Sequence, residues 1–143
     1  MIFESLKVEN IMGCRYEIEF DPRYTVIIGN NRQGKTLTAR LIMLALYGTG
    51  RRVRELHDSW KLRTEELLPV SDKGSVELVF KAGERRYKIY REFGRRSKVE
   101  FYVEKEGSWE LEHYKDTDVK TALEEEVGIT PGLMNVVMSN EQS

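Results

Sequence analysis

Alternating apolar and polar positions near the start of the chain predict a β-hairpin. Tyr16, Ile18 and Phe20 are separated by Glu17 and Glu19, which is the two-residue period of a half-buried strand. We therefore expect residues 6–20 to form two paired strands. A short apolar segment, 24–28, follows a turn at 21–22 and is typical of a fully buried strand.

The same two-residue period returns in the second half of the chain. Its apolar positions are Val76, Leu78 and Phe80, then Tyr87, Ile89 and Phe93, then Val99, Phe101 and Val103. Gly83, Gly94 and Gly107 fall between these segments, and Trp109 with Leu111 suits a short fourth strand. Consecutive strands joined by short turns that contain glycine predict an antiparallel meander over 75–112.

Three segments have helical patterns. Residues 35–47 are apolar almost throughout, which predicts a core helix, with Gly48 and Gly50 at its end. A helix capped by Asp116 or Thr117 is expected to stop at Gly128. A shorter one should begin at 130–131 and run through residue 135, whereas 51–69 suits a broken helix or an ordered loop.

Composition limits the class of protein. The 143 residues contain 23 Lys and Arg against 24 Asp and Glu, which excludes a uniformly basic nucleic-acid coat and leaves room for a local patch. Cys14 is the single cysteine, so no intrachain disulfide or cysteine zinc cluster is expected. His57 and His113 have no partner at a metal-ligand spacing. The longest apolar run, 41–47, is far below the roughly 20 residues of a membrane span, and a cytoplasmic protein is expected.

The clearest chemical signal is the segment 29–36, Gly-Asn-Asn-Arg-Gln-Gly-Lys-Thr, which fits G-x-x-x-x-G-K-[ST]. It lies between a predicted strand and a predicted helix, whose free N-terminal amides bind anions. Lys35 should reach the β- and γ-phosphates, and the Thr36 hydroxyl should ligate Mg²⁺. The residues predicted to bind nucleotide are Gly29, Asn30, Asn31, Arg32, Gln33, Gly34, Lys35, Thr36 and Leu37.

One expected part of a P-loop enzyme is missing. The Mg²⁺ shell is normally completed by an acid at the end of a second apolar strand. No run of four apolar residues followed by Asp or Asp-Glu occurs after Thr36, and residues 124–126, all Glu, lie in a predicted helix with a solvated face. The chain is therefore expected to hold half of a catalytic site.

The hairpin, the phosphate loop, the meander and a late glutamine together resemble the N-terminal ATPase half of the structural-maintenance-of-chromosomes (SMC) superfamily, especially the Rad-fifty ATPase of DNA double-strand-break repair. The resemblance rests on residues 6–10, Leu-Lys-Val-Glu-Asn, on 26–31, Val-Ile-Ile-Gly-Asn-Asn, on 34–36, and on 135–138 leading to Gln142, which is similar to the family's Q-loop. Relatives commonly carry Gly-Ser or Gly-Cys where this chain has Arg32 and Gln33, and a hydroxyl residue where it has Leu37.

The resemblance implies several properties. ATP and Mg²⁺ would bind, with Lys35 and Gln142 in catalytic roles and with Thr36 and Gln142 at the metal. A coiled coil and a C-terminal half carrying the signature and Walker B motifs would follow residue 143, and two heads would dimerise around ATP. DNA and a repair nuclease would be partners.

Basic residues gather around one predicted hairpin, and two tyrosines are interleaved with them. This composition suits contact with a phosphate backbone, although a basic hairpin is also simply a solvated edge. The basic residues of this cluster are Arg85, Arg86, Lys88, Arg91, Arg95, Arg96 and Lys98, and all of them except Arg91 are the candidates for DNA contact.

We thus expect an α/β P-loop ATPase half-domain over residues 1–143. Residues 1–50 would supply the hairpin, the P-loop strand and the helix within a mixed sheet. Residues 75–112 would form a separate antiparallel layer, and 116–143 the helices and the Q-loop-like end. The alternatives are a self-contained P-loop NTPase or kinase, and a non-catalytic DNA-binding module with a vestigial P-loop.

Overall fold

The computed structural model describes residues 1–20, 32–49, 55–62, 66 and 73–142, with side chains for all of these except 32–36 and 139–142. The predicted strand 24–28 lies outside this part of the chain. The strands are β1 (Ile2–Ile11), β2 (Cys14–Glu19), β3 (Lys73–Ala82), β4 (Arg85–Gly94), β5 (Lys98–Lys105) and β6 (Ser108–His113). The predictions of an N-terminal hairpin and of a four-stranded meander are both confirmed.

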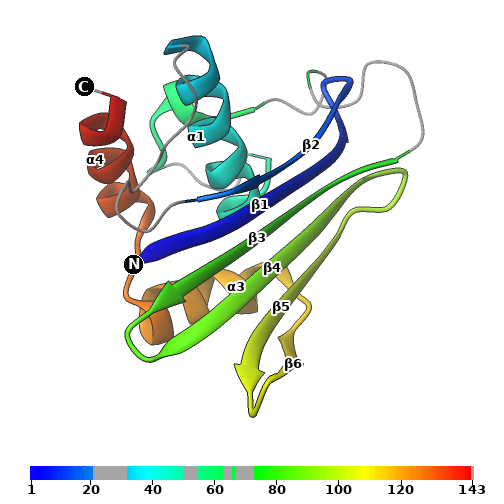
Figure 1. The fold of residues 1–143 in the computed structure, drawn as a ribbon, viewed down its shortest axis with the longest axis vertical. Coiled ribbons are helices and arrows are strands. Elements are labelled where there is room, and N and C mark those ends of the chain that lie inside the picture. The colour runs from blue at the N-terminus through cyan, green and yellow to red at the C-terminus, as the bar shows by residue number, and fades with distance from the viewer. Residues whose placement is uncertain (21–31, 50–54, 63–65, 67–72, 143) are drawn as a thin grey trace.

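The described strands form one antiparallel sheet in the order β2-β1-β3-β4-β5-β6 (Figure 1). The sequence led us to expect the meander as a separate layer. This expectation is wrong, because the meander continues the sheet of the N-terminal hairpin. β1 pairs with β3 along its length, with Leu6 opposite Leu78 and Val8 opposite Val76. Because both strands turn these apolar side chains to the same face, pairing them joins two half-buried surfaces into one.

The helices lie on a single face of this sheet. The helical elements whose bounds fall within the described ranges are α1 (Arg32–Tyr47), the short η2 (Asp58–Trp60), α3 (Asp116–Ala122), the π-helical turn η3 (Leu123–Val127) and α4 (Pro131–Gln142). α1 contacts β3 and β4, and α4 packs beside it (Figure 1). Residues 41–47 of α1 are all buried, which confirms the prediction of a core helix.

α4 is longer than expected. Thr130 and Pro131 do begin it, and the Thr130 hydroxyl accepts a hydrogen bond from the Leu133 amide at 3.1 Å. The predicted end at Asn135 is wrong, because the helix continues to Gln142. Met134 and Met138 are both fully buried, so the apolar face continues at a spacing of four residues and favours further helix.

A buried guanidinium joins the end of α1 to the sheet and to α3. Arg91 lies on the core face of β4 and is only 4% exposed. Its Nε donates to the carbonyl oxygen of Ala45 at 2.7 Å and its Nη2 to that of Leu46 at 2.9 Å, while its Nη1 bonds the carboxylate of Asp116. Burial lowers the pKa of Arg91, and Asp116 opposes this shift.

This arrangement explains two local features. Gly48 follows α1 with φ +74°, and a Cβ there would lie 3.0 Å from Arg91 Nη1, so both the backbone and the guanidinium require glycine. The predicted cap of α3 by Asp116 or Thr117 is wrong. The N-cap is Lys115, without a side-chain bond, because the Asp116 carboxylate pairs with Arg91 instead.

Replacing Asp116 tests this contact. Asp116→Asn would leave the buried cation of Arg91 without its counter-charge. The Asp116 side chain is 48% exposed, so water partly compensates, and we expect a loss of about 1.5–3 kcal/mol in the free energy of unfolding. Urea unfolding measures it. Asp118→Asn, an exposed change on the same helix, should alter stability by less than about 0.5 kcal/mol, and equal losses in both variants would contradict the assignment.

Candidate functional site

The predicted phosphate-binding loop spans the boundary of the described residues. Gly29, Asn30 and Asn31 lie outside them, whereas Arg32, Gln33, Gly34, Lys35 and Thr36 form the beginning of α1. The helix was expected to start at Lys35 and starts three residues earlier, at Arg32. Arg and Gln have good helix propensity, which agrees with this earlier start. The last five residues of the motif therefore already belong to the helix, whose first backbone amides have no partner within the helix and can bind an anion.

The beginning of α1 suits a bound phosphate. Its first turn contains no acidic residue, so no carboxylate there competes for the unpaired backbone amides. Lys35 and Thr36 are the residue types that hold phosphate and Mg²⁺ in P-loop proteins. Leu37, the last predicted nucleotide-binding residue, is half-buried and its side chain packs against the core. The residues present thus fit a magnesium nucleotide.

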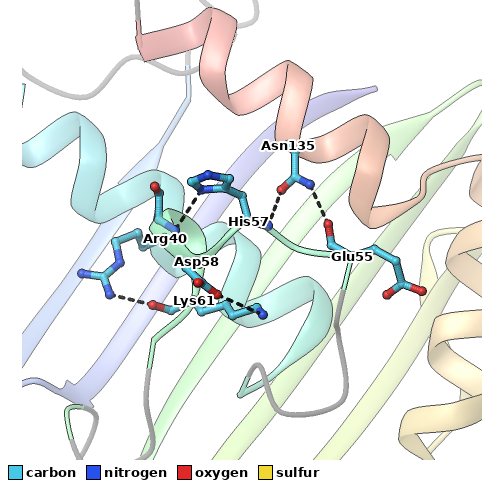
Figure 2. A network of polar contacts seen from close by, with 7 residues as sticks. Arg40, Glu55, His57, Asp58, Lys61 and Asn135 are labelled. Atoms are coloured by element: carbon cyan, nitrogen blue, oxygen red, sulfur yellow. Dashed lines mark hydrogen bonds and ion pairs between the residues drawn. The ribbon is translucent and has the colours of Figure 1, made fainter.

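A polar contact fixes the middle of α1. Arg40 donates from Nη2 to the carbonyl oxygen of Lys61 at 2.6 Å (Figure 2). The same nitrogen lies 3.5 Å from the Glu66 carboxylate. This ties the helix to the segment around η2. That segment belongs to the stretch expected to be a broken helix or an ordered loop, and its residue Trp60 is buried. The N-cap of η2 is His57, whose Nδ1 accepts from the Ser59 amide at 3.1 Å.

Asn135 connects α4 to the same segment. Its Oδ1 accepts from the His57 amide at 2.9 Å, and its Nδ2 donates to the Glu55 carbonyl oxygen at 2.7 Å (Figure 2). The side chain thus bridges backbone groups about 80 residues away. Sequence analysis did not predict this role, because an asparagine in a helix gives no signal of a distant backbone partner.

Gln142, the predicted Q-loop residue, is the last residue of α4. Its side chain lies outside the described part, so its roles at the metal and in catalysis stay predictions. The helix containing it contacts α1, and Lys35 and Thr36 are the fourth and fifth residues of α1. The structure therefore places both predicted catalytic residues on neighbouring helices.

The basic residues predicted to contact DNA do not form one patch. Arg85 and Arg86 begin β4, whereas Arg95 and Arg96 follow its other end, about 30 Å away at strand spacing. Arg95 and Arg96 are exposed. Arg91 is buried in the core and is not available to a ligand.

Several of these cations have acidic partners on neighbouring strands. Arg86 bonds Glu4 at 2.8 Å and also Glu104, and the hydrogen bond to Glu4 raises the pKa of Arg86. Lys88 lies 3.7 Å from Glu77 and 4.5 Å from the ring centre of Tyr102. These carboxylates come from β1, β3 and β5, and so they could not be recognised from the sequence of the hairpin.

Glu92 organises the end of β4 near Arg95. Its carboxylate accepts from the Tyr90 hydroxyl at 2.8 Å and lies 3.3 Å from Lys73 and 3.9 Å from Lys98. The bond from Tyr90 and the two lysines lower the pKa of Glu92. Lys98 is therefore also shared with an acid. Arg85, Arg95 and Arg96 remain as exposed candidates for phosphate contact, and of these Arg95 and Arg96 lie next to each other at the β4–β5 turn.

The family of the chain follows from comparison with known proteins. A model of the AAA domain family matches residues 5–140, almost the whole chain. The chain therefore belongs to the AAA domain family, a family of P-loop ATPases found in SMC and Rad-fifty-like proteins. Among curated proteins, none matches it. The predicted P-loop ATPase class is confirmed at this level.

No helix within the described ranges combines the length and the apolar character needed to cross a membrane.

Exchange of one amide tests the contact made by Asn135. Asn135→Ala removes the acceptor of the His57 amide and the donor to Glu55, so we expect faster hydrogen exchange at His57 and a loss of about 1–3 kcal/mol for two hydrogen bonds. Asn135→Asp keeps the acceptor, and it should retain protection at His57. Unchanged exchange at His57 in the alanine variant would show that this contact is absent in solution.

Proposed function

We propose that this chain is the Mg²⁺-ATP-binding half of an SMC or Rad-fifty-like ATPase head that acts on DNA, in double-strand-break repair or chromosome maintenance. The observation that carries the proposal is the phosphate-loop motif 29–36, whose last five residues begin the helix α1, within a chain of the AAA domain family. Family membership makes it an ATPase-type protein; the branch and the biological role are our inference.

The order of elements supports the SMC-like assignment. A hairpin precedes the P-loop, the antiparallel meander follows α1, and a helix ending in Gln142 comes last. Nucleotide binding would use the amides and side chains at the start of α1, with Thr36 and Gln142 as metal ligands. Lys35 would neutralise charge on the β- and γ-phosphates.

Hydrolysis would need residues from outside this chain. The sequence after Thr36 contains no apolar strand ending in an acid, and such an acid normally completes the Mg²⁺ shell and positions the attacking water. We propose that a C-terminal half, with signature and Walker B motifs, and a second head in an ATP-dependent dimer supply these groups. A repair nuclease is the proposed further partner.

Replacing Lys35 tests nucleotide binding. Bound ATP stabilises the folded chain by about 2.7 kcal/mol when its concentration is 100 times Kd, which corresponds to a rise of several degrees in Tm. Lys35→Ala should lose most of this rise, because it removes the positive charge that we propose neutralises the β- and γ-phosphates. Differential scanning fluorimetry with Mg²⁺-ATP, Mg²⁺ alone and ATP with EDTA measures the effect.

Lys7→Ala is the matched control, since it removes an exposed lysine from β1, and it should keep the full shift. Equal shifts in wild type and Lys35→Ala would contradict P-loop binding. Steady turnover of ATP by the isolated chain would favour a self-contained P-loop NTPase over the proposed half-site.

DNA contact at the β4–β5 turn is tested by the salt dependence of binding. The double substitution Arg95→Glu with Arg96→Glu should lower the slope of log K against log salt concentration by about 1.8 if each arginine neutralises one duplex phosphate. Lys7→Glu with Lys81→Glu changes the net charge equally on exposed positions of other strands and should leave the slope nearly unchanged. Equal slopes for all three proteins would contradict contact at this turn, and affinity indifferent to nucleotide and to Lys35 would favour the binding-module alternative.

A further inference from the structure

Three potential metal ligands meet at the edge of the sheet, beside η3. Glu112 and His113 end β6, and Glu126 lies in the π-helical turn. One ligand atom from each side chain lies within 4.8 Å of the other two. Glu112 and His113 are half-buried and Glu126 is exposed, so the group is open to solvent on one side. No such cluster was expected from the spacing of the two histidines.

An irregularity of β6 brings its two ligands together. In a regular strand, neighbouring side chains point to opposite faces. Here His113 pairs with Phe101 while Leu111 pairs with Tyr102, so the register shifts at Glu112. Such a bulge changes the direction of a side chain, which explains how adjacent residues direct ligand atoms to one place.

The third ligand comes from a second irregular element. Glu126 lies in the five-residue π-helical turn that follows α3 and ends at Gly128 with φ +83°. Its Oε1 is 3.9 Å from His113 Nε2. The imidazole packs against Phe101, with ring centres 5.7 Å apart, which restricts the orientation of its nitrogens. Single π-turns inside helices often occur at functional positions.

We propose that Glu112, His113 and Glu126 bind a divalent transition-metal ion, with Zn²⁺ as the best fit. One imidazole nitrogen and two carboxylate oxygens are a donor set that zinc accepts, with water in a fourth position. Ligand bonds of about 2.0–2.2 Å require the donors to approach by roughly 1 Å, a change that rotation of half-exposed side chains allows. Mg²⁺ prefers oxygen ligands alone, so this site differs in selectivity from that of a magnesium nucleotide.

The carboxylates around the site favour a bound cation, and the amino group of Lys105 is its competitor. Glu110, Glu124 and Glu125 are further carboxylates on the same two elements. Lys105 lies 3.4 Å from Glu112 and 3.5 Å from Glu110, so it can remain paired with Glu110 when Glu112 turns to a metal. The amino group therefore opposes metal binding without blocking it.

The site also lies away from the phosphate loop. Arg91 bonds both the last turn of α1 and Asp116, three residues after His113, so the cluster is near the C-terminal end of α1. The predicted phosphate-binding motif includes the N-terminal end of α1, and the two ends of this 16-residue helix are about 24 Å apart. Nucleotide-free protein can therefore be used to study the proposed metal site without the magnesium nucleotide.

Isothermal titration of nucleotide-free protein with ZnCl₂ at pH 7.5 tests the proposal. We expect one site, with affinity lowered by more than about tenfold in His113→Ala and in Glu126→Gln. The chain offers matched controls. His57→Ala removes the other histidine and Glu125→Gln an adjacent exposed carboxylate, and both should keep wild-type affinity. Lys105→Ala should bind zinc more tightly, because it removes the competing cation.

Visible absorption of bound Co²⁺ provides a second measurement, since it reports nitrogen and oxygen coordination and should disappear with His113→Ala. Far-UV circular dichroism of the zinc-free variants shows whether each one folds, and His113→Gln serves if the alanine variant does not. Equal zinc affinity in all variants would overturn the proposal, as would equal losses in the two histidine variants. Absence of zinc binding to wild type would leave the 3.9 Å approach of His113 and Glu126 as a simple side-chain contact and would also overturn the proposal. Neither result bears on Mg²⁺-ATP binding at Lys35.

Discussion

The contact on which the arrangement of helices and sheet depends is the buried guanidinium of Arg91. It occupies a core position of β4, between Ile89 and Phe93, where an apolar residue would otherwise be expected. Removing a cation from water is costly, and burial lowers its pKa accordingly. Two carbonyl oxygens at the end of α1 and the carboxylate of Asp116 offset that cost. The carbonyls also carry the negative end of the helix dipole, so one side chain compensates the C-terminus of α1 and orients α3.

The position of α1 determines what its other end can do. A helix held at its last turn by Arg91 and at its middle by the contact of Arg40 with the Lys61 carbonyl has little freedom to shift along the sheet. Its N-terminal amides are then fixed in space, and fixed dipoles stabilise phosphate charge without reorganisation. Asn135 joins α4 to the backbone of Glu55 and His57. These residues belong to the same segment, 55–61, whose last carbonyl accepts from Arg40. The helix containing Gln142 and the helix containing Lys35 are thus connected through one short segment.

The sequence was sufficient for features that depend on local periodicity. It predicted the hairpin, the meander and the buried helix, because periods of two and of about four residues survive in the folded chain. The sequence was not sufficient where the role of a residue depends on a partner that is distant in the sequence. Arg91 resembles any exposed strand arginine until α1 and α3 cover it, and Asp116 resembles a helix cap until Arg91 takes its carboxylate. The pairing of β1 with β3 also depends on residues that are distant in the sequence. The same holds for the acids that face Arg86 and Lys88. The phosphate loop was recognisable because its chemistry needs contiguous residues.

The two candidate binding regions differ in how the fold produces them. The phosphate site relies on a regular element, since a straight and buried helix presents aligned amides at its first turn. The Glu112, His113 and Glu126 cluster relies on two departures from regularity, a register shift in β6 and a π-turn after α3. Each departure gives up regular hydrogen bonding, and each turns a ligand toward the same point. Regular pairing of β6 would place Glu112 and His113 on opposite faces of the sheet. The bulge is therefore the feature that allows both side chains to bind one metal ion. Arg91 holds the start of α3 only three residues after His113. The contact that anchors α1 therefore also restrains the helix that leads from β6 to η3.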